Sequence, residues 1–242
     1  MIEYQLIRSH KRKSIALQVK QGLVIVRAPQ YVKESYIQQF VLQKSSWLEV
    51  KLLTQNNLLK EQALNHQGIV LSENGFLWFE GIRKNISLTF SSKNCIENHG
   101  DSIQITLAQR YKNVDKTRQQ KVIKQLVEAW FKQSAETVIA EKVKYFSAQL
   151  NLYPSNIKVR QYKARWGSCN NYGQLNFNYL LMMVPDWVIN YVVVHELCHL
   201  KHLNHSRQFW SLVEAFFPRF KEAKHWLKVH QSHLQWPTQY IT

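Results

Sequence analysis

The chain has 242 residues, of which 45% are hydrophobic and 12% aromatic, a composition that favours a globular protein and excludes a disordered one. Its 32 lysines and arginines against 16 aspartates and glutamates give a formal net charge of +16. Such a surplus attracts polyanions and predicts nonspecific binding of DNA or RNA through a basic surface. The basic residues are dispersed along the chain, so a solvated surface explains them equally well.

The sequence carries no signal for a membrane or for secretion. No apolar run reaches the length of a membrane span, and residues 1–6 contain no basic segment that leads into an apolar one. We therefore expect a cytoplasmic protein without membrane association. The cysteines Cys95, Cys169 and Cys198 are widely spaced and form no CxxC pair, so we expect three free thiols.

The first half of the chain alternates between strand-like and helical patterns. Alternating apolar residues predict strands at 4–7, 14–19 and 23–27, and a helical spacing then predicts one helix from Val32 to about Lys60. Short strand-like runs return between residues 65 and 107, separated by Asn-Gly and His-Gly turn signals. Three of these runs are residues 76–79, 86–90 and 103–107.

The second half begins with a predicted long helix from about Asp115 to Leu150, which Pro154 separates from the next element. Strands are predicted at 157–160 and 174–178, with a turn between them. An almost wholly apolar helix from Trp187 follows, and Ser206 is a suitable N-cap for another helix that reaches Phe216.

Residues 195–205 read HELCHLKHLNH, which contains the HExxH pattern of zinc enzymes. On a helix, His195 and His199 lie about 40° apart around the axis and about 6 Å apart along it, so both can bind one ion. Glu196 lies at the rim of that face, where it can deprotonate a water bound to the ion. The apolar run before the motif predicts a buried helix, whose ionisable groups need a partner such as a metal.

A third ligand can come from His202 or His205. In a continuous helix His202 would stand roughly 7 to 8 Å beyond the ion along the axis, which is too far. A helix that ends near His202 to Asn204 can turn back, through residues that tolerate positive φ, and bring His205 to the ion. We therefore predict His195, His199 and His205 as Zn²⁺ ligands with a water in the fourth position, and His202 as a surface residue or a neighbour of the ligands.

The order helix, strand, turn, strand and zinc helix is that of a small zincin, in which an edge strand beside the metal can pair with substrate. We therefore predict an α+β fold in two parts. Residues 1–112 form a mostly β region with one helix, and residues 113–242 form the zincin-like catalytic half.

Three segments resemble the YgjP-like metallopeptidase domain family: RWGSC at 165–169, VVVHELCHL at 192–200 and NHSRQFW at 204–210. The likeness covers most of the chain, which one YgjP-like unit could then span. The resemblance implies a zinc-dependent hydrolase with His195, His199 and His205 as ligands and Glu196 as the catalytic base. It also implies kinship with SprT-like and WLM zinc proteases, some of which act on proteins attached to DNA.

The predicted reaction is hydrolysis of peptide bonds in a protein or peptide substrate, including proteins associated with nucleic acid. Glu196 would take a proton from the zinc-bound water and pass it to the leaving amine. Arg165 is a candidate to stabilise the oxyanion, because it lies in the RWGSC segment; a structural ion pair beside Trp166 is the alternative role.

Two other functions stay open. A metal-dependent endoribonuclease could use the same three histidines, and a basic protein suits an RNA substrate. A noncatalytic, zinc-stabilised module that binds nucleic acid is the other alternative. Glu196 beside three ligands argues against a purely structural site, which would more often be closed by a fourth Cys or His.

Overall fold

A computed structural model describes residues 2–20, 22–64, 69–162, 165–232 and 234–236, without the side chains of residues 57–64. The chain forms two compact units, Met1–His66 and Gln67–Thr242. The domain boundary predicted between residues 112 and 113 lies inside the second unit, because the strands before it pack against the helix that follows it.

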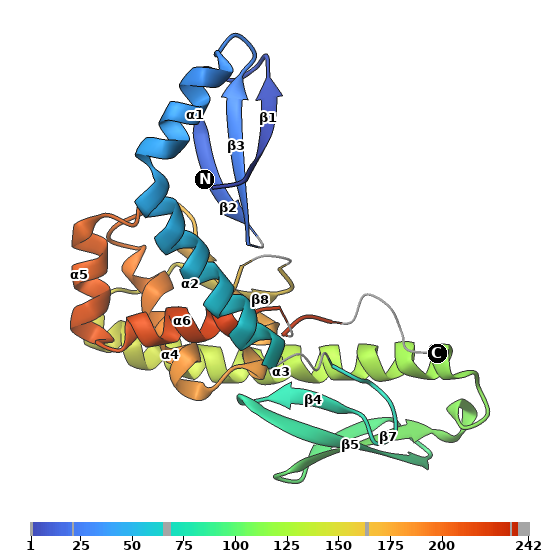
Figure 1. The fold of residues 1–242 in the computed structure, drawn as a ribbon. Coiled ribbons are helices and arrows are strands. Elements are labelled where there is room, and N and C mark those ends of the chain that lie inside the picture. Colours follow the sequence, from blue (N-terminus) through green and yellow to red (C-terminus); the bar gives the residue numbers. More distant parts are fainter. Residues whose placement is uncertain (1, 21, 65–68, 163–164, 233, 237–242) are drawn as a thin grey trace. The chain divides into compact units, whose positions relative to one another are not determined.

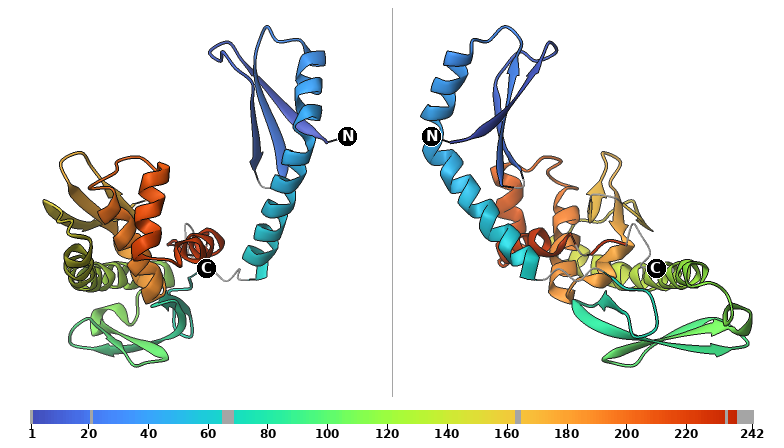
Figure 2. Two further views of the ribbon diagram at one scale, coloured as in Figure 1. Left: turned by 90° about the vertical axis from the view of Figure 1, so that its left-hand side faces the viewer. Right: turned by 45° about the vertical axis from the view of Figure 1, so that its right-hand side comes forward.

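The first unit is a three-stranded sheet with two helices on one face (Figure 2). Its strands are β1 (Tyr4–Ser9), β2 (Ala16–Lys20) and β3 (Leu23–Pro29), in the order β1-β3-β2, with β1 parallel and β2 antiparallel to β3.

Two helices, α1 (Glu34–Gln43) and α2 (Ser45–Leu64), occupy the region where a single helix was predicted. The helical geometry breaks at Lys44, which has φ −104° and ψ 10°. Ile37 of α1 and Leu48 of α2 both join the buried cluster around Val26 of β3. The break at Lys44 thus accompanies the packing of both helices in one small core.

The second unit begins with a four-stranded sheet on one side of the long helix α3 (Lys116–Leu150), as Figure 1 shows. Its strands are β4 (Phe76–Phe79), β5 (Ile82–Ser91), β6 (Cys95–Asn98) and β7 (Ser102–Ala108), in the order β4-β5-β7-β6. The short helix η1 (Gln109–Tyr111) leads from β7 towards α3, whose N-cap Asp115 accepts a hydrogen bond from the Arg118 amide at 2.9 Å. The predicted strands and the long helix are confirmed, apart from residues 65–68, which lie outside the described residues.

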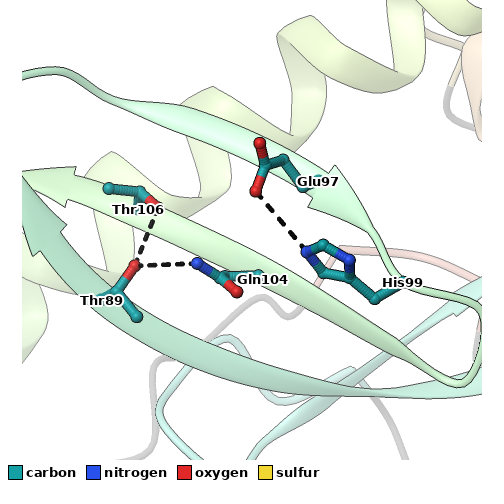
Figure 3. A network of polar contacts seen from close by, with 5 residues as sticks. All are labelled: Thr89, Glu97, His99, Gln104 and Thr106. Carbon is teal, nitrogen blue, oxygen red and sulfur yellow. Dashed lines mark hydrogen bonds and ion pairs between the residues drawn. The ribbon is translucent and has the colours of Figure 1, made fainter.

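One face of this sheet is apolar and the other polar. Residues 103, 105 and 107 of β7 are buried in the main core. On the other face, the hydroxyls of Thr89 and Thr106 lie 2.8 Å apart in register, and Gln104 donates to Thr89 at 3.4 Å (Figure 3). His99 lies 3.5 Å from the Glu97 carboxylate, and both side chains are about half exposed. The polar face therefore belongs to the surface, and the apolar face fixes the sheet against α3.

The other side of α3 carries a second sheet and the remaining helices (Figures 1 and 2). The sheet contains β8 (Asn156–Arg160), β9 (Gly167–Cys169) and β10 (Gln174–Asn178) in the order β8-β10-β9, so β9 is an edge strand. The short helix η2 (Tyr179–Met183) then leads to α4 (Asp186–Cys198), α5 (Arg207–Phe216) and α6 (Phe220–His230).

Helix α4 is held against α3 by burial and by one ion pair. Val188, Val193 and Leu197 are fully buried, and Lys142 of α3 binds both Asp186 and Asn190 at 2.6 Å. The predicted α+β class is confirmed, with six α-helices and three small sheets in the part of the chain that the structure describes. None of the described helices combines the length and apolarity that crossing a membrane requires.

Candidate metal centre

The candidate site begins at the carboxyl end of α4. The helix ends at Cys198, earlier than the predicted end near His202 to Asn204, and His199 is its C-cap. The following residues form tight turns, in which the amides of Leu200 and Lys201 bond to the carbonyls of Leu197 and Cys198. The early end of α4 lets the chain turn back sooner than the sequence suggested. Neither His202 nor Asn204 adopts positive φ, so the turn does not use the tolerance of these residues for it.

The turn brings His205 back to the other two histidines of the motif. Ser206 caps α5 as predicted, with its hydroxyl accepting from the Phe209 amide at 3.3 Å. The Nε2 atom of His195 lies 3.2 Å from Nε2 of His199 and 3.1 Å from Nε2 of His205. Two nitrogens bound to one tetrahedral zinc ion at about 2.0 to 2.1 Å are about 3.3 Å apart. The three rings therefore have the spacing of a metal site, and together they form a group that could hold an ion.

The outer nitrogens of two rings have partners that orient the inner nitrogens. His199 Nδ1 lies 2.9 Å from the main-chain carbonyl of His202, which can only accept, so Nδ1 carries the hydrogen and the Nε2 lone pair points to the cluster. His195 Nδ1 lies 3.4 Å from the hydroxyl of Tyr191, one helical turn earlier. The His199 contact favours the tautomer that leaves Nε2 free to bind a metal, and the Tyr191 hydroxyl can accept a hydrogen bond from His195 Nδ1 in the same tautomer.

Aromatic side chains of α5 form a wall beside the cluster. The buried Phe209 ring stacks on His199 with centroids 4.4 Å apart, and Trp210 stacks on His205 at 5.5 Å. These contacts limit the rotation of both imidazoles and shield one side of the cluster from water. The NHSRQFW segment therefore supplies both a candidate ligand and the packing around it.

Burial keeps His195 and His199 neutral. Burial, followed by the proximity of His199, His205 and Lys224, lowers the pKa of His195 to about 3. Burial also lowers the pKa of His199, although its bond to the His202 carbonyl opposes this effect. Both imidazoles are thus unprotonated at neutral pH, the form that binds metal ions.

Glu196 is buried beside the cluster, with only 5% of its surface exposed. Burial raises the pKa of its carboxyl to about 8, and the positive charge of Arg165 opposes this shift. Its Oε2 atom has no hydrogen-bond partner among the described residues. A buried carboxylate oxygen without a partner is costly and is expected only where water, substrate or a cation meets it.

Strand β9 approaches this carboxylate closely. A Cβ atom added at Gly167 would lie 2.6 Å from Glu196 Oε1 and 2.7 Å from its Cγ. Only glycine therefore fits between the edge strand and the glutamate in the observed arrangement. The thiol of Cys169, two residues along the strand, has a pKa raised to about 11 by burial and by the Glu196 charge, so it is not a reactive thiolate.

The sequence also indicated Arg165 and His202 as candidate site residues, and the two relate differently to the histidine cluster. Arg165 is exposed at the entrance to β9, and its charge acts on Glu196. Its predicted role towards an oxyanion stays a prediction, and no ion pair of its guanidinium appears within the described residues. His202 contributes its main-chain carbonyl to His199.

Sequence reasoning missed two residues that shape the site, Tyr191 and Gly167. Tyr191 stands four residues before His195, which is the spacing of neighbours on one helix face, so the sequence contained a signal for its contact. Gly167 lies in the RWGSC segment, but nothing local shows that its neighbour is Glu196.

The family described as YgjP-like, metallopeptidase domain, matches residues 13–230. The chain therefore belongs to the YgjP-like metallopeptidase family, and it is a metal-dependent peptidase by this membership. Residues of both compact units fall within the match, in agreement with the resemblance seen in the sequence.

Two solved structures are similar to part of the chain. The metallopeptidase zymogen of Pyrococcus abyssi abylysin shows 24% identity over 38% of this chain and 95% of its own, with a TM-score of 0.36. The metallopeptidase zymogen of Methanocaldococcus jannaschii jannalysin shows 24% identity over 39% and 95%, with a TM-score of 0.34. A comparison with curated proteins gives no match.

Proposed function

We propose that the protein is a zinc-dependent peptidase in which His195, His199 and His205 bind the ion and Glu196 is the general base. The observation that carries this proposal is the convergence of three Nε2 atoms beside a buried carboxylate oxygen without a partner. Three histidines leave one position of a tetrahedral ion open, which is typical of catalytic rather than structural zinc.

Glu196 carries out the proton transfers of the proposed reaction. When bound, zinc polarises the substrate carbonyl and lowers the pKa of water toward ~7. Glu196 accepts the proton of the attacking water and delivers it to the leaving amine. Burial among α4, β9 and the aromatic wall excludes bulk water from this transfer.

The proposed substrate is an unfolded or extended protein segment, because β9 offers a sheet edge beside Glu196. The net charge of +16 supports a preference for proteins that are associated with nucleic acid. In that case DNA would bring enzyme and substrate together without entering the reaction.

The function is tested with purified protein that has been stripped of metal and reloaded with zinc. We expect about one zinc per chain by elemental analysis, cleavage of an unstructured protein such as casein, loss of cleavage with a chelator and recovery with zinc. DNA is added in a parallel arm to test the role of the charge. Cleavage of single-stranded RNA in place of casein would overturn the proposal in favour of a ribonuclease.

Replacing Tyr191 by phenylalanine is expected to weaken zinc binding by roughly 10-fold to 100-fold, the usual cost of losing a hydrogen bond to a metal-bound histidine. The variant removes only the hydroxyl that meets His195 Nδ1 and keeps the buried ring. Competition with a chromophoric chelator measures the affinity. Tyr145→Phe, at an exposed tyrosine of α3, is the control, and equal affinities in both variants would contradict the role of Tyr191.

Gly167→Ala is expected to lower kcat by about 100-fold, because a displacement of roughly 1 Å in a catalytic group has such an effect. The new methyl group would meet Glu196 at 2.6 Å and push its carboxylate away from the cluster. Zinc content should stay unchanged, since no candidate ligand is touched. Ser91→Ala, at an exposed position of β5 outside the site, serves as the control. Full activity in Gly167→Ala would show that the position of Glu196 does not matter.

A further inference from the structure

A cavity of about 220 Å³ opens beside the start of β9. Tyr162, Arg165 and Trp166 line one part of it, and Gln231 and Gln235 line another. Such a volume is close to that of one amino-acid side chain with a water or two, since each water occupies about 30 Å³. The cavity lies in the second unit, and neither Glu196 nor the three histidines belong to its described lining.

The lining of the cavity contains both polar and apolar side chains and one charged group. Arg165 is the one charged residue among its described lining residues, and no carboxylate is present there. The side chain of Asn178 is already used, since it donates to the carbonyls of Tyr162 and Arg165 at 3.0 Å. These two bonds hold the main-chain carbonyls of Tyr162 and Arg165 in place. The guanidinium of Arg165 and the amides of the two glutamines remain to meet a ligand.

The floor of the cavity is formed by residues of the main core. Leu180 of η2 and Leu234 near the carboxyl end are 5% and 0% exposed and belong to the main core. The hydroxyl of Tyr162 accepts from Arg160 Nε at 2.9 Å and contacts Ser168 Oγ at 3.1 Å, so this side chain is held in place. A cavity with an apolar floor, amide side chains and one guanidinium is suited to a carboxylate, which arginine binds through two hydrogen bonds.

The cavity is adjacent to the proposed reaction centre along the chain and in space. Trp166 in its wall directly precedes Gly167, whose backbone touches Glu196, and the Arg165 charge acts on Glu196. A substrate strand paired with β9 would therefore place a neighbouring side chain at this cavity.

The direction of the substrate follows from the sheet. β9 is an edge strand with an antiparallel neighbour on its other side, and antiparallel pairs are the more stable type per residue. A substrate strand antiparallel to β9 has its carboxyl side at the amino end of β9, where Arg165 and Trp166 lie. The cavity thus serves a residue on the carboxyl side of the scissile bond.

We infer that this cavity is a specificity site for a carboxylate on the carboxyl side of the scissile bond, with Arg165 as the residue that determines the specificity. The inference rests on the proposed peptidase function. The carboxylate can belong to an aspartate or glutamate side chain or to the free carboxyl end of a peptide. Arg165 is exposed and acts on the buried Glu196 by its charge, but the two side chains form no ion pair of about 4 Å or less. A role of Arg165 in substrate selection accounts for this arrangement.

The test is digestion of a mixed peptide library by the zinc-loaded, full-length protein, with cleavage sites read by mass spectrometry. We expect enrichment of Asp and Glu at the first positions after the cleaved bond. Matched peptides with Glu, Gln or Lys at the enriched position then give kcat/KM, and we expect Glu to exceed Gln by about tenfold or more, as a charge-assisted hydrogen bond predicts. Peptides with free and amidated carboxyl ends separate the two sources of the carboxylate.

Variants of Arg165 assign the preference to this residue. The ratio of Glu to Gln peptides should fall to near one in Arg165→Gln, and Arg165→Glu should favour the Lys peptide. Because each ratio compares two peptides in the same enzyme, it is not changed by a general loss of activity. Arg110→Gln removes the same charge outside the cavity and should keep the wild-type ratio.

The outcomes separate this inference from the proposed function. Cleavage that is indifferent to charge, a preference on the amino side of the bond, or an unchanged ratio in Arg165→Gln would overturn the inference alone. Absence of cleavage of every peptide by the zinc-loaded protein would overturn the proposed function and the inference with it.

Discussion

The Glu196→Gln variant is expected to bind zinc like the wild type and to hydrolyse peptides about 10²-fold to 10⁴-fold more slowly, the contribution of a positioned general base. Glutamine has nearly the same volume, so it fits the 5% exposed position between α4 and β9. Its amide cannot accept a proton from water at neutral pH. The loss should therefore fall on kcat, while the metal site and KM change little.

The measurement is steady-state turnover of one peptide together with the zinc content of each preparation. Glu214→Gln makes the same chemical change on the exposed face of α5, where Glu214 lies 3.7 Å from Lys221, and should leave kcat unaltered. Turnover of Glu196→Gln within about threefold of the wild type would contradict the role of Glu196 as general base, because the loss of a general base costs far more.

The second large effect is expected from the third histidine. His205→Ala should reduce zinc affinity by more than about 100-fold, beyond the cost of losing an outer hydrogen bond, and should abolish peptidase activity. The His205 Nε2 atom lies 3.1 Å from that of His195, so its removal leaves two protein ligands. A chelator competition at fixed pH measures the affinity, because protons compete with the metal for imidazole.

His202→Ala is the matched control for this prediction. The contact of His202 with His199 uses the main-chain carbonyl, which alanine retains, so zinc affinity should be unchanged. Equal losses in the two variants would refute the choice of His205. X-ray absorption of the zinc-loaded protein should show three imidazoles and one oxygen, whereas four protein ligands would favour the noncatalytic zinc module.

Much of the site could be predicted from local sequence. HExxH spacing places His195 and His199 on one helix face, and Ser206 marks the start of the next helix. Together they require a turn between the two helices that carries His205 back to the cluster, and the structure shows this return. Local periodicity also predicted most strands of the two sheets of the second unit, because burial on one face imposes a repeat along the sequence, but it gave no range for the short strands β6 and β9.

Other features depend on contacts between residues that are far apart in the chain. The chain divides after His66 and not near residue 112, because β4 to β7 share their core with α3. The expected single helix breaks at Lys44, and both halves join one small core. Side-chain periodicity shows which face of an element is buried, but it does not show which other element covers that face. Neither the division after His66 nor the break at Lys44 could therefore be predicted from local sequence.

By itself, the sequence determined which residues are the candidates for the metal chemistry, since helix geometry turns the spacing of His195, Glu196 and His199 into a defined arrangement. Only the tertiary structure decided how these side chains are oriented, buried and hydrogen-bonded. It placed Gly167 against Glu196 and gave the outer nitrogens of His195 and His199 their partners. The physical reason is that side-chain orientation, burial and pKa depend on packing between elements, whereas spacing along one helix depends on that helix alone.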